Sequence, residues 1–391
     1  MTSYKRLFAR ALAAAPERLH FAAHSHHLWP DASFEGQVAA WEDAARLADH
    51  KWAKVMGEVW PAAQGEVAAE LRLPDPATVV FAPNTHELLT RLVSAAPPGR
   101  LRALSSDGEF HSFRRQAARW AESGRFDLET VATDGPDFAG RFLDRAQTGG
   151  FDLIFVSQVM FGSGLVVEPL AALAALAKPE GPWVVVDGYH GFMALETDLS
   201  AVADRIFYLA GGYKYAMAGE GAAFLHAPAG FGPRPEITGW YAEFAELERT
   251  PGATGFPADA RRFLGATFDP SGLYRFLAVR RMLAAEGLTT AVANAHVAGL
   301  RERLLAGRSE TPLGAARLIN PPAPGPQARF LALRSPQAAE WALELEREGV
   351  VVDVRGEVLR IGFGLHQDVD DVDRLLAHCR ALPRSSFEAS K

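Results

Sequence analysis

The chain is poor in cysteine and has no long apolar run. Its one cysteine among 391 residues is Cys379, so no disulfide bond can form within it. A reducing, cytoplasmic setting is therefore expected. No stretch reaches the roughly 20 apolar residues that a membrane-spanning helix requires. We therefore predict a soluble protein with no membrane partner.

Basic charge is not in excess either. Lysine and arginine together number 40 against 47 aspartates and glutamates, which gives a formal net charge of −7. Binding to a nucleic-acid backbone needs clustered lysine and arginine, so no nucleic-acid partner is expected. The composition is that of an ordinary globular protein, without internal repeats or low-complexity segments.

Short apolar segments alternate with helical stretches through the middle of the chain. These segments are TVVFAP (78–83), RALSS (102–106), LIFVS (153–157), WVVVD (183–187), IFYLA (206–210) and AAFLHA (222–227). The alternation predicts an α/β fold whose large sheet is mostly parallel and covered on both faces. Helix is expected over 36–71, with a break near Pro61, and one long helix over 271–306.

The last third of the chain continues the alternation on a smaller scale. A strand at 328–334, a helix, two further strands and a final helix from Asp368 predict a second, smaller α/β unit. The expected division has three parts. Residues 1–60 are an N-terminal segment that joins the small domain, 61–275 are the large domain, and 276–391 are the small C-terminal domain.

Ligands of a parallel α/β sheet gather at the carboxyl ends of its strands, and two candidate groups fall there. Asp187 closes the strand WVVVD, and His190 follows in DGYH. A carboxylate in that place can hold a cation or a protonated ring nitrogen, or it can simply cap a helix. Lys214 lies in the glycine-flanked loop GGYKYAMAGEG, where a desolvated amine is a good nucleophile toward an aldehyde. A solvated loop lysine is the alternative.

Two further features point to anionic ligands. PNTHE (83–87) lies between a strand and a helix, where free backbone N–H groups bind phosphate, although Asn84 or Thr85 can equally be a helix cap. Arg360 lies within the apolar strand VLRIGF. A buried guanidinium needs a carboxylate, from the protein or from a substrate.

A phosphate cradle, a strand-end aspartate, a loop lysine and a carboxylate-binding arginine together are typical of pyridoxal 5′-phosphate (PLP) chemistry on an amino acid. The sequence resembles the class V PLP enzymes of fold type I, and among them the kynureninases. The motifs that carry the resemblance are FAAHSHHLWP (21–30), DGYHGF, GGYKYAMAGEG, ITGWYAEF (237–244) and GVVVDVRGEVLRIGFGLHQDVDDVDRLL.

The resemblance implies a role for each matching residue. Lys214 is implied to bind the cofactor as a Schiff base and to move the Cα proton, Asp187 to pair with the pyridine nitrogen, and His190 to support the ring. The other implied cofactor contacts are the backbone N–H groups of Thr85 and His86, the ring of Phe110, and the side chains of Gln158, Tyr213 and Trp240. The implied substrate contacts are Arg360, at the α-carboxylate, Ser25 and Phe161. A homodimer is implied as well.

Some positions depart from the kynureninase pattern. Phe161 stands where that family has a tyrosine proton donor, and RRFLGATFDPSG has no clear counterpart of an asparagine that reaches the substrate ring. No cysteine lies near Arg360, which argues against a desulfurase with a cysteine nucleophile, and Cys379 is expected to be packing in the last helix.

The histidines of the opening loop do not predict a metal site. Neighbouring side chains on a short loop, such as His24, His26 and His27, rarely point to one centre, so we expect substrate contact instead.

Three functions are consistent with these residues. The leading hypothesis is a kynureninase-like enzyme that cleaves the Cβ–Cγ bond of an amino acid hydrolytically. The alternative is a class V aminotransferase or β-lyase with the same cofactor. A non-catalytic sensor or scaffold is the alternative of another class, and the presence of Lys214, Asp187 and Arg360 together argues against it.

Overall fold

The computed structural model describes residues 2–246, 252 and 254–383. Its strands are β1 (Leu19–His20), β2 (Val79–Ala82), β3 (Leu101–Ser106), β4 (Phe126–Val131), β5 (Leu153–Ser157), β6 (Trp183–Asp187), β7 (Ile206–Ala210), β8 (Ala223–His226), β9 (Arg317–Leu318), β10 (Phe330–Arg334), β11 (Val350–Val351), β12 (Asp353–Arg355) and β13 (Val358–Gly362). Its α-helices are α1 (Ala9–Ala13), α2 (Asp31–Leu47), α3 (Lys51–Lys54), α4 (Trp60–Leu71), α5 (Thr85–Ser94), α6 (His111–Glu122), α7 (Phe138–Gln147), α8 (Leu170–Ala174), α9 (Ser271–Ala285), α10 (Thr290–Gly307), α11 (Ala338–Arg347) and α12 (Val369–Arg380).

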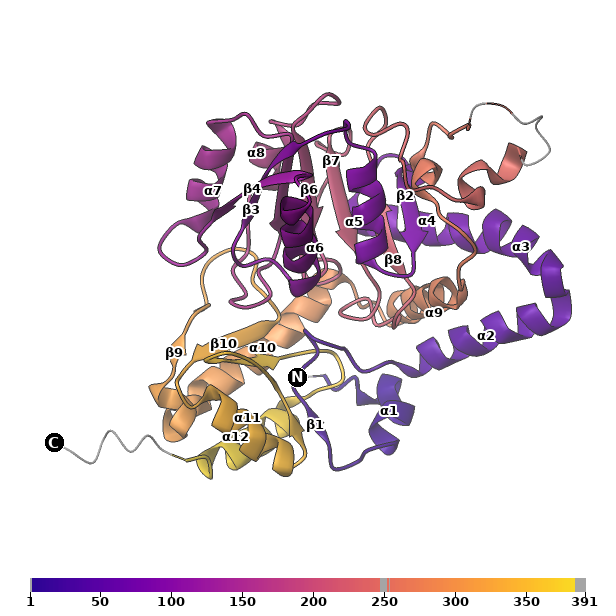
Figure 1. Cartoon of the computed structure of the whole chain (residues 1–391). Coiled ribbons are helices and arrows are strands. Elements are labelled where there is room, and N and C mark those ends of the chain that lie inside the picture. The colour runs from indigo at the N-terminus through magenta and orange to yellow at the C-terminus, as the bar shows by residue number, and fades with distance from the viewer. Residues whose placement is uncertain (1, 247–251, 253, 384–391) are drawn as a thin grey trace.

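A seven-stranded sheet forms the upper part of the molecule in Figure 1, in the order β2-β8-β7-β6-β5-β3-β4. The pairs from β4 through β3, β5 and β6 to β7 are parallel, whereas β8 is antiparallel to both of its neighbours. Every residue of β5 and β7 is buried, which explains their uninterrupted apolar sequences. The mostly parallel sheet expected from the sequence is confirmed.

The edge strand β4 was not expected from the sequence. Its residues Phe126–Val131 (FDLETV) include two acidic side chains, and only Phe126 of the strand is buried. A strand with one neighbour has less of its surface covered, so it lacks the apolar run that reveals the central strands.

Two helical predictions were wrong in their boundaries. The helical stretch 36–71 is interrupted at Ala48, which has a φ of 48°, and not at Pro61. Pro61 lies in the first turn of α4, where the N–H that proline lacks has no intrahelical acceptor. The single helix expected over 271–306 is two helices, because Gly287 has a φ of 64° after the end of α9.

A second, antiparallel sheet of order β12-β13-β10-β9 lies below the large sheet in Figure 1, in orange and yellow. The N-terminal segment joins this part of the molecule. Strand β1 pairs in parallel with β11, with Leu19 opposite Val350, and Ala22 bridges to Gly362. The chain then continues as a loop over residues 23–30 toward the large sheet.

The borders at residues 60 and 275 stay a prediction. Residues 247–251, 253 and 384–391, which the expected domain ranges include, lie outside the described part of the chain. No helix within that described part is both long and apolar enough to cross a membrane.

Candidate active site

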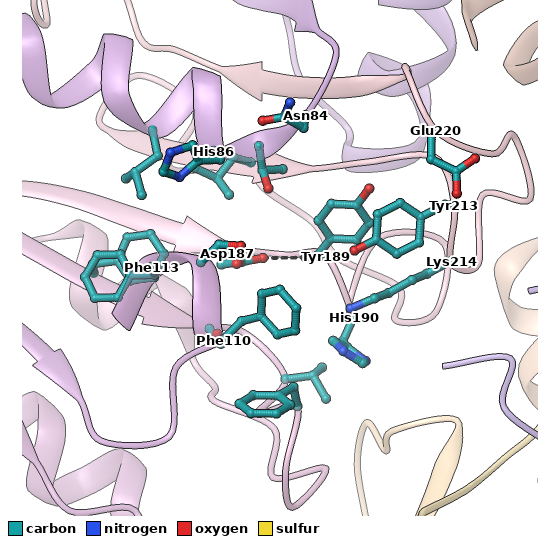
Figure 2. A pocket seen from close by; sticks show the side chains of 18 of the residues that line it. Asn84, His86, Phe110, Phe113, Asp187, Tyr189, His190, Tyr213, Lys214 and Glu220 are labelled. Atoms are coloured by element: carbon teal, nitrogen blue, oxygen red, sulfur yellow. Dashed lines mark hydrogen bonds between the residues drawn. The ribbon is translucent and has the colours of Figure 1, made fainter. Parts of the chain in front are cut away.

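A cavity of about 210 Å³ opens at the carboxyl ends of the central parallel strands (Figure 2). Ser157 at the end of β5, Asp187 at the end of β6 and Leu209 in β7 reach it from the sheet. The predicted site residues that line it are Thr85, His86, Phe110, Phe161, Asp187, His190, Tyr213 and Lys214. Residues that are distant in sequence therefore meet where a parallel α/β sheet places its ligands.

Lys214 is buried at the wall of this cavity. Its side chain is among aromatic rings, with Nζ 4.9 Å from the ring centroid of Tyr189 and 5.6 Å from that of Phe110. Burial lowers the pKa of this amine to about 7, while the charge of Asp187 raises it and that of Arg360 lowers it. A substantial fraction of the amine is therefore neutral, and nucleophilic, at neutral pH.

Asp187 is held in place at the end of β6. Its Oδ1 accepts a hydrogen bond of 2.9 Å from the backbone N–H of Tyr189, drawn in Figure 2. Burial raises the pKa of the carboxyl group, whereas the Tyr189 N–H and the charge of Lys214 lower it. A cation or a protonated ring nitrogen beside this carboxylate would compensate its desolvation.

His190 lies close to the amino end of the Lys214 side chain in Figure 2. Burial moves the pKa of His190 well below its usual value, and the positive charge of Lys214 lowers it further. Its Nδ1 is buried and has no hydrogen-bond partner among the described residues. His190 is therefore a neutral imidazole whose free nitrogen is available to a bound ligand.

The N-terminus of α5 forms the opposite wall of the cavity. Asn84 caps this helix, because its Oδ1 accepts a hydrogen bond of 3.0 Å from the N–H of Glu87. The first N–H groups of the helix, at Thr85 and His86, have no acceptor within the helix. The helix cap predicted for PNTHE is thus confirmed at Asn84. The cap leaves the earlier N–H donors free for an anion, and phosphate binding there stays a prediction.

Aromatic side chains form the sides of the cavity. Phe110 precedes α6, while Tyr213 and Tyr189 lie with their ring centroids 4.6 Å apart. Gly211 permits this arrangement, since a Cβ atom there would lie 2.3 Å from the Tyr189 hydroxyl. A flat ring bound in the cavity would therefore lie against aromatic faces.

Arg360 does not line the cavity but lies directly behind Phe161. Its guanidinium donates hydrogen bonds to the carbonyl oxygen of Phe161 and to the carboxylate of Asp353. Asp353 also forms an ion pair of 2.6 Å with Arg355. The carboxylate that the sequence required for Arg360 is thus supplied by the protein, and a substrate carboxylate must share the guanidinium with Asp353.

Besides Arg360, three further predicted residues do not line the cavity. The Gln158 side chain points away from it, toward Glu168, Thr197 and Tyr208, because Tyr208 donates a 2.8 Å hydrogen bond to its Oε1. Trp240 is 41% exposed and donates to Thr267, and Ser25 is outside the lining as well.

The histidines of the opening loop diverge. His24 is fully buried against Phe330, with ring centroids 4.8 Å apart. His26 stacks on Tyr213 at 4.6 Å, and Nδ1 of His27 donates a hydrogen bond of 2.8 Å to the carbonyl oxygen of Leu28. Within the described residues, no group of three or more metal-ligating side chains converges.

Sequence reasoning missed the buried Glu109 beneath Phe110. Its carboxylate accepts hydrogen bonds from the hydroxyl of Ser106 and from the N–H and hydroxyl of Ser157, so it links the ends of β3 and β5. Burial raises the pKa of Glu109 to about 7. An acidic residue between Gly108 and Phe110, directly after an apolar strand, is the signal that could have found it.

Taken together, the cavity fits a flat, phosphorylated aldehyde. The N-terminus of α5 can hold a phosphate, Asp187 can hold a protonated ring nitrogen, and Lys214 can attack an aldehyde carbon. The unpartnered Nδ1 of His190 leaves room for one further hydrogen bond to such a ligand.

Solved structures share the fold over almost the whole chain. A complex of the cystine C–S lyase C-DES with its reaction product cysteine persulfide matches with a TM-score of 0.80, at 18% identity, over 95% of this chain and 99% of that one. A C-DES mutant with glycine covalently linked to the PLP cofactor matches with a TM-score of 0.81 at 17% identity, over 98% of this chain and 100% of that one. The apo cysteine desulfurase from Thermococcus onnurineus NA1 matches with a TM-score of 0.75 at 19% identity, over 96% of this chain and 98% of that one. Fold type I, as predicted, is thus confirmed.

A sequence relative that matches over most of this chain is isopenicillin N epimerase of Streptomyces clavuligerus. It is 28% identical over 359 residues, which cover 85% of this chain and 86% of the relative. No protein-family model matches the chain. The narrower resemblance to kynureninases is not supported by these comparisons and stays a prediction.

Proposed function

We propose that the protein is a PLP-dependent enzyme that acts on an amino acid. The observation that carries the proposal is Lys214, a buried amine with a pKa of about 7 that faces a cavity shared with Asp187 and the N-terminus of α5. The PLP cofactor of the C-DES mutant, a protein of the same fold whose cofactor is covalently linked to glycine, supports this choice of cofactor.

Bound PLP supplies a ring that withdraws electrons from the substrate Cα. Lys214 would hold the aldehyde carbon of the cofactor, and its free amine would take the proton from the substrate Cα. Asp187 would keep a proton on the ring nitrogen. Backbone N–H groups of Thr85 and His86 would bind the phosphate, and Phe110 would pack on the ring face.

Among the reactions open to such a site, we favour β-elimination from a β-substituted amino acid. This reaction needs a base at Cα, which Lys214 provides, and no nucleophile from the protein. The Cys379 side chain is buried in the hydrophobic core of the smaller C-terminal unit, and burial raises the pKa of its thiol to about 12. This thiol therefore does not serve as a desulfurase nucleophile. The relation to a C–S lyase supports the same reaction.

Kynureninase-like hydrolysis is the second candidate. Phe161 offers no hydroxyl for proton donation, but the His111 ring lies 5.2 Å from the Phe161 ring and is exposed. His111 could therefore supply the proton that a tyrosine supplies in that family.

Product analysis tests the proposed reaction. The PLP-loaded protein is incubated with cystine, other β-substituted alanines, kynurenine and unsubstituted amino acids. Equal release of a 2-oxo acid and ammonia supports β-elimination, release of alanine from kynurenine supports hydrolysis, and a 2-oxo acid formed only with an added amine acceptor supports transamination. Failure to turn over any of them with bound PLP would support the non-catalytic alternative.

We predict that Arg360→Leu raises KM for the amino-acid substrate. A charge-assisted guanidinium–carboxylate pair contributes about 1.5–3 kcal/mol, which corresponds to about tenfold to a hundredfold in KM. Arg360→Lys should restore part of the loss, since lysine lacks the planar fork. Asp353 keeps its ion pair with Arg355, so the variant should fold. An unchanged KM in steady-state assays would remove Arg360 from substrate binding.

The protein is expected to be a homodimer in which Trp240 of one subunit contacts the cofactor phosphate in the active site of the other subunit. Trp240 matches the predicted phosphate contact, yet it is 41% exposed and lies outside the cavity of its own chain. Light scattering at micromolar concentration should give twice the chain mass of 42.3 kDa. A fully active monomer would contradict this prediction.

A further inference from the structure

Arg301 is a buried arginine whose Nε has no hydrogen-bond partner in the described part of the chain. It lies in α10 with 7% of its surface exposed, its Nε is fully buried, and its side chain has no hydrogen bond or ion pair with any residue that the structure describes. An arginine keeps its charge in a protein, so an uncompensated one in this position is unfavourable unless an anion comes to it. Burial lowers the pKa of Arg301, and the charge of its exposed sequence neighbour Glu302, which raises this pKa, offsets only part of that effect.

Arg301 faces a cavity of about 460 Å³ between α10 and the segment 322–329 that leads into β10. Arg329, 4% exposed, lines the same cavity, and its Nε donates a hydrogen bond of 2.8 Å to Asn294. Both arginines thus line this cavity, and Arg329 also donates a hydrogen bond of 3.4 Å to the carbonyl oxygen of Thr290.

The remaining wall of this cavity is largely apolar, with Leu195, Val297 and Leu305 among its residues. Its two carboxylates, those of Glu196 and Glu302, belong to exposed residues. A ligand that fits has one anionic group for the arginines and an apolar body for the rest.

This cavity shares no lining residue with the candidate active site. A cleft of about 700 Å³ adjoins both, because Phe161 lines it together with the active site and Arg301 lines it together with this cavity. The charge of Arg301 is therefore not explained by the cofactor or by the carboxylate that Arg360 would bind.

We propose that the cavity is a second ligand site, which takes a small organic carboxylate with an apolar body. Arg301 and Arg329 bind the carboxylate, because planar guanidinium groups match it in shape and charge. The proposal goes beyond the PLP-dependent function and does not depend on it.

Calorimetric titration of the full chain with hexanoate, and with the uncharged hexanamide, tests the site. Hexanoate should bind saturably, and hexanamide at least about tenfold more weakly, because the charge-assisted pair is lost. Arg301→Leu should weaken hexanoate binding by a similar factor. Arg303→Leu is the matched control on the same helix, where the arginine is exposed and pairs with Asp373, and it should leave the affinity unchanged.

Two further variants keep the test decisive. Arg360→Leu should retain hexanoate binding, which distinguishes this site from the active site. Arg301→Lys, which keeps the charge, should fold and bind more weakly than the wild type, so it replaces Arg301→Leu if that variant does not fold. The proposal is overturned if hexanoate does not saturate, if hexanamide binds equally well, or if Arg301 variants bind hexanoate as the wild type does.

Discussion

Lys214→Ala should remove both turnover and the visible absorbance of lysine-linked PLP. Proton transfer by a positioned side chain contributes about 10²–10⁴-fold to a rate, and this variant also loses the covalent attachment of the cofactor. The measurements are an absorbance spectrum of the PLP-loaded variant and product formation with the best substrate of the amino-acid panel.

The exposed Lys178 provides the matched control. Lys178→Ala should retain the wild-type spectrum and rate. If borohydride still fixed the cofactor to a lysine of Lys214→Ala, another residue would be the attachment site and the assignment would be wrong.

The pH dependence of cofactor attachment follows from the same residue. A solvated lysine has a pKa of about 10.4, whereas burial lowers that of Lys214 to about 7. Since the neutral amine is the nucleophile, attachment to the apo protein should accelerate as pH rises through about 7 and level off above it. A rate that still rises tenfold per pH unit between 8 and 10 would show that the amine is solvated.

Asp187→Asn should keep the cofactor bound and slow removal of the Cα proton. A nearby carboxylate raises the pKa of a cationic group, here the ring nitrogen of the cofactor, by about 1–3 units. Without the carboxylate the protonated fraction of that nitrogen falls by about tenfold for each unit by which its pKa lies below the working pH. The amide oxygen can still accept the Tyr189 N–H, so the loop should keep its conformation.

Exchange of the substrate Cα proton with deuterated solvent, followed by NMR, isolates this step from product release. Asp198→Asn is a suitable control, because Asp198 is exposed and pairs with Arg72 at the surface. Wild-type exchange in Asp187→Asn would mean that the carboxylate does not act on the ring nitrogen.

The sequence predicted the position of a site residue where that residue directly follows an apolar strand. The apolar sequences of β5, β6 and β7 show where each of these strands ends. Asp187 and the loop of Lys214 could therefore be assigned to one edge of the sheet from the sequence alone. Side-chain direction could not be read in this way. Gln158 directly follows β5, yet its amide points to Tyr208 and away from the cavity.

Side-chain pairing between strands could not be predicted from the sequence either. The sequence required a carboxylate for Arg360 but could not choose between a substrate and Asp353, seven positions earlier in the neighbouring strand β12. The buried Glu109 was missed for a similar reason, since its partner Ser157 comes from a different strand. Such contacts depend on the register of strands that the amino-acid pattern does not specify.

The pairing of β1 with β11 also has a consequence for synthesis of the chain. Leu19 is translated long before its partner Val350, because 330 residues separate them in the sequence. The large sheet can assemble earlier from neighbouring segments, whereas the opening loop, in which His26 stacks on Tyr213, lacks its strand pairing until β11 is made. Contacts between such distant residues form late and slowly during folding. A chain that has not yet formed β11 would thus carry Lys214 without the β1–β11 pairing that fixes the loop against Tyr213, so activity should appear only after β11 is made.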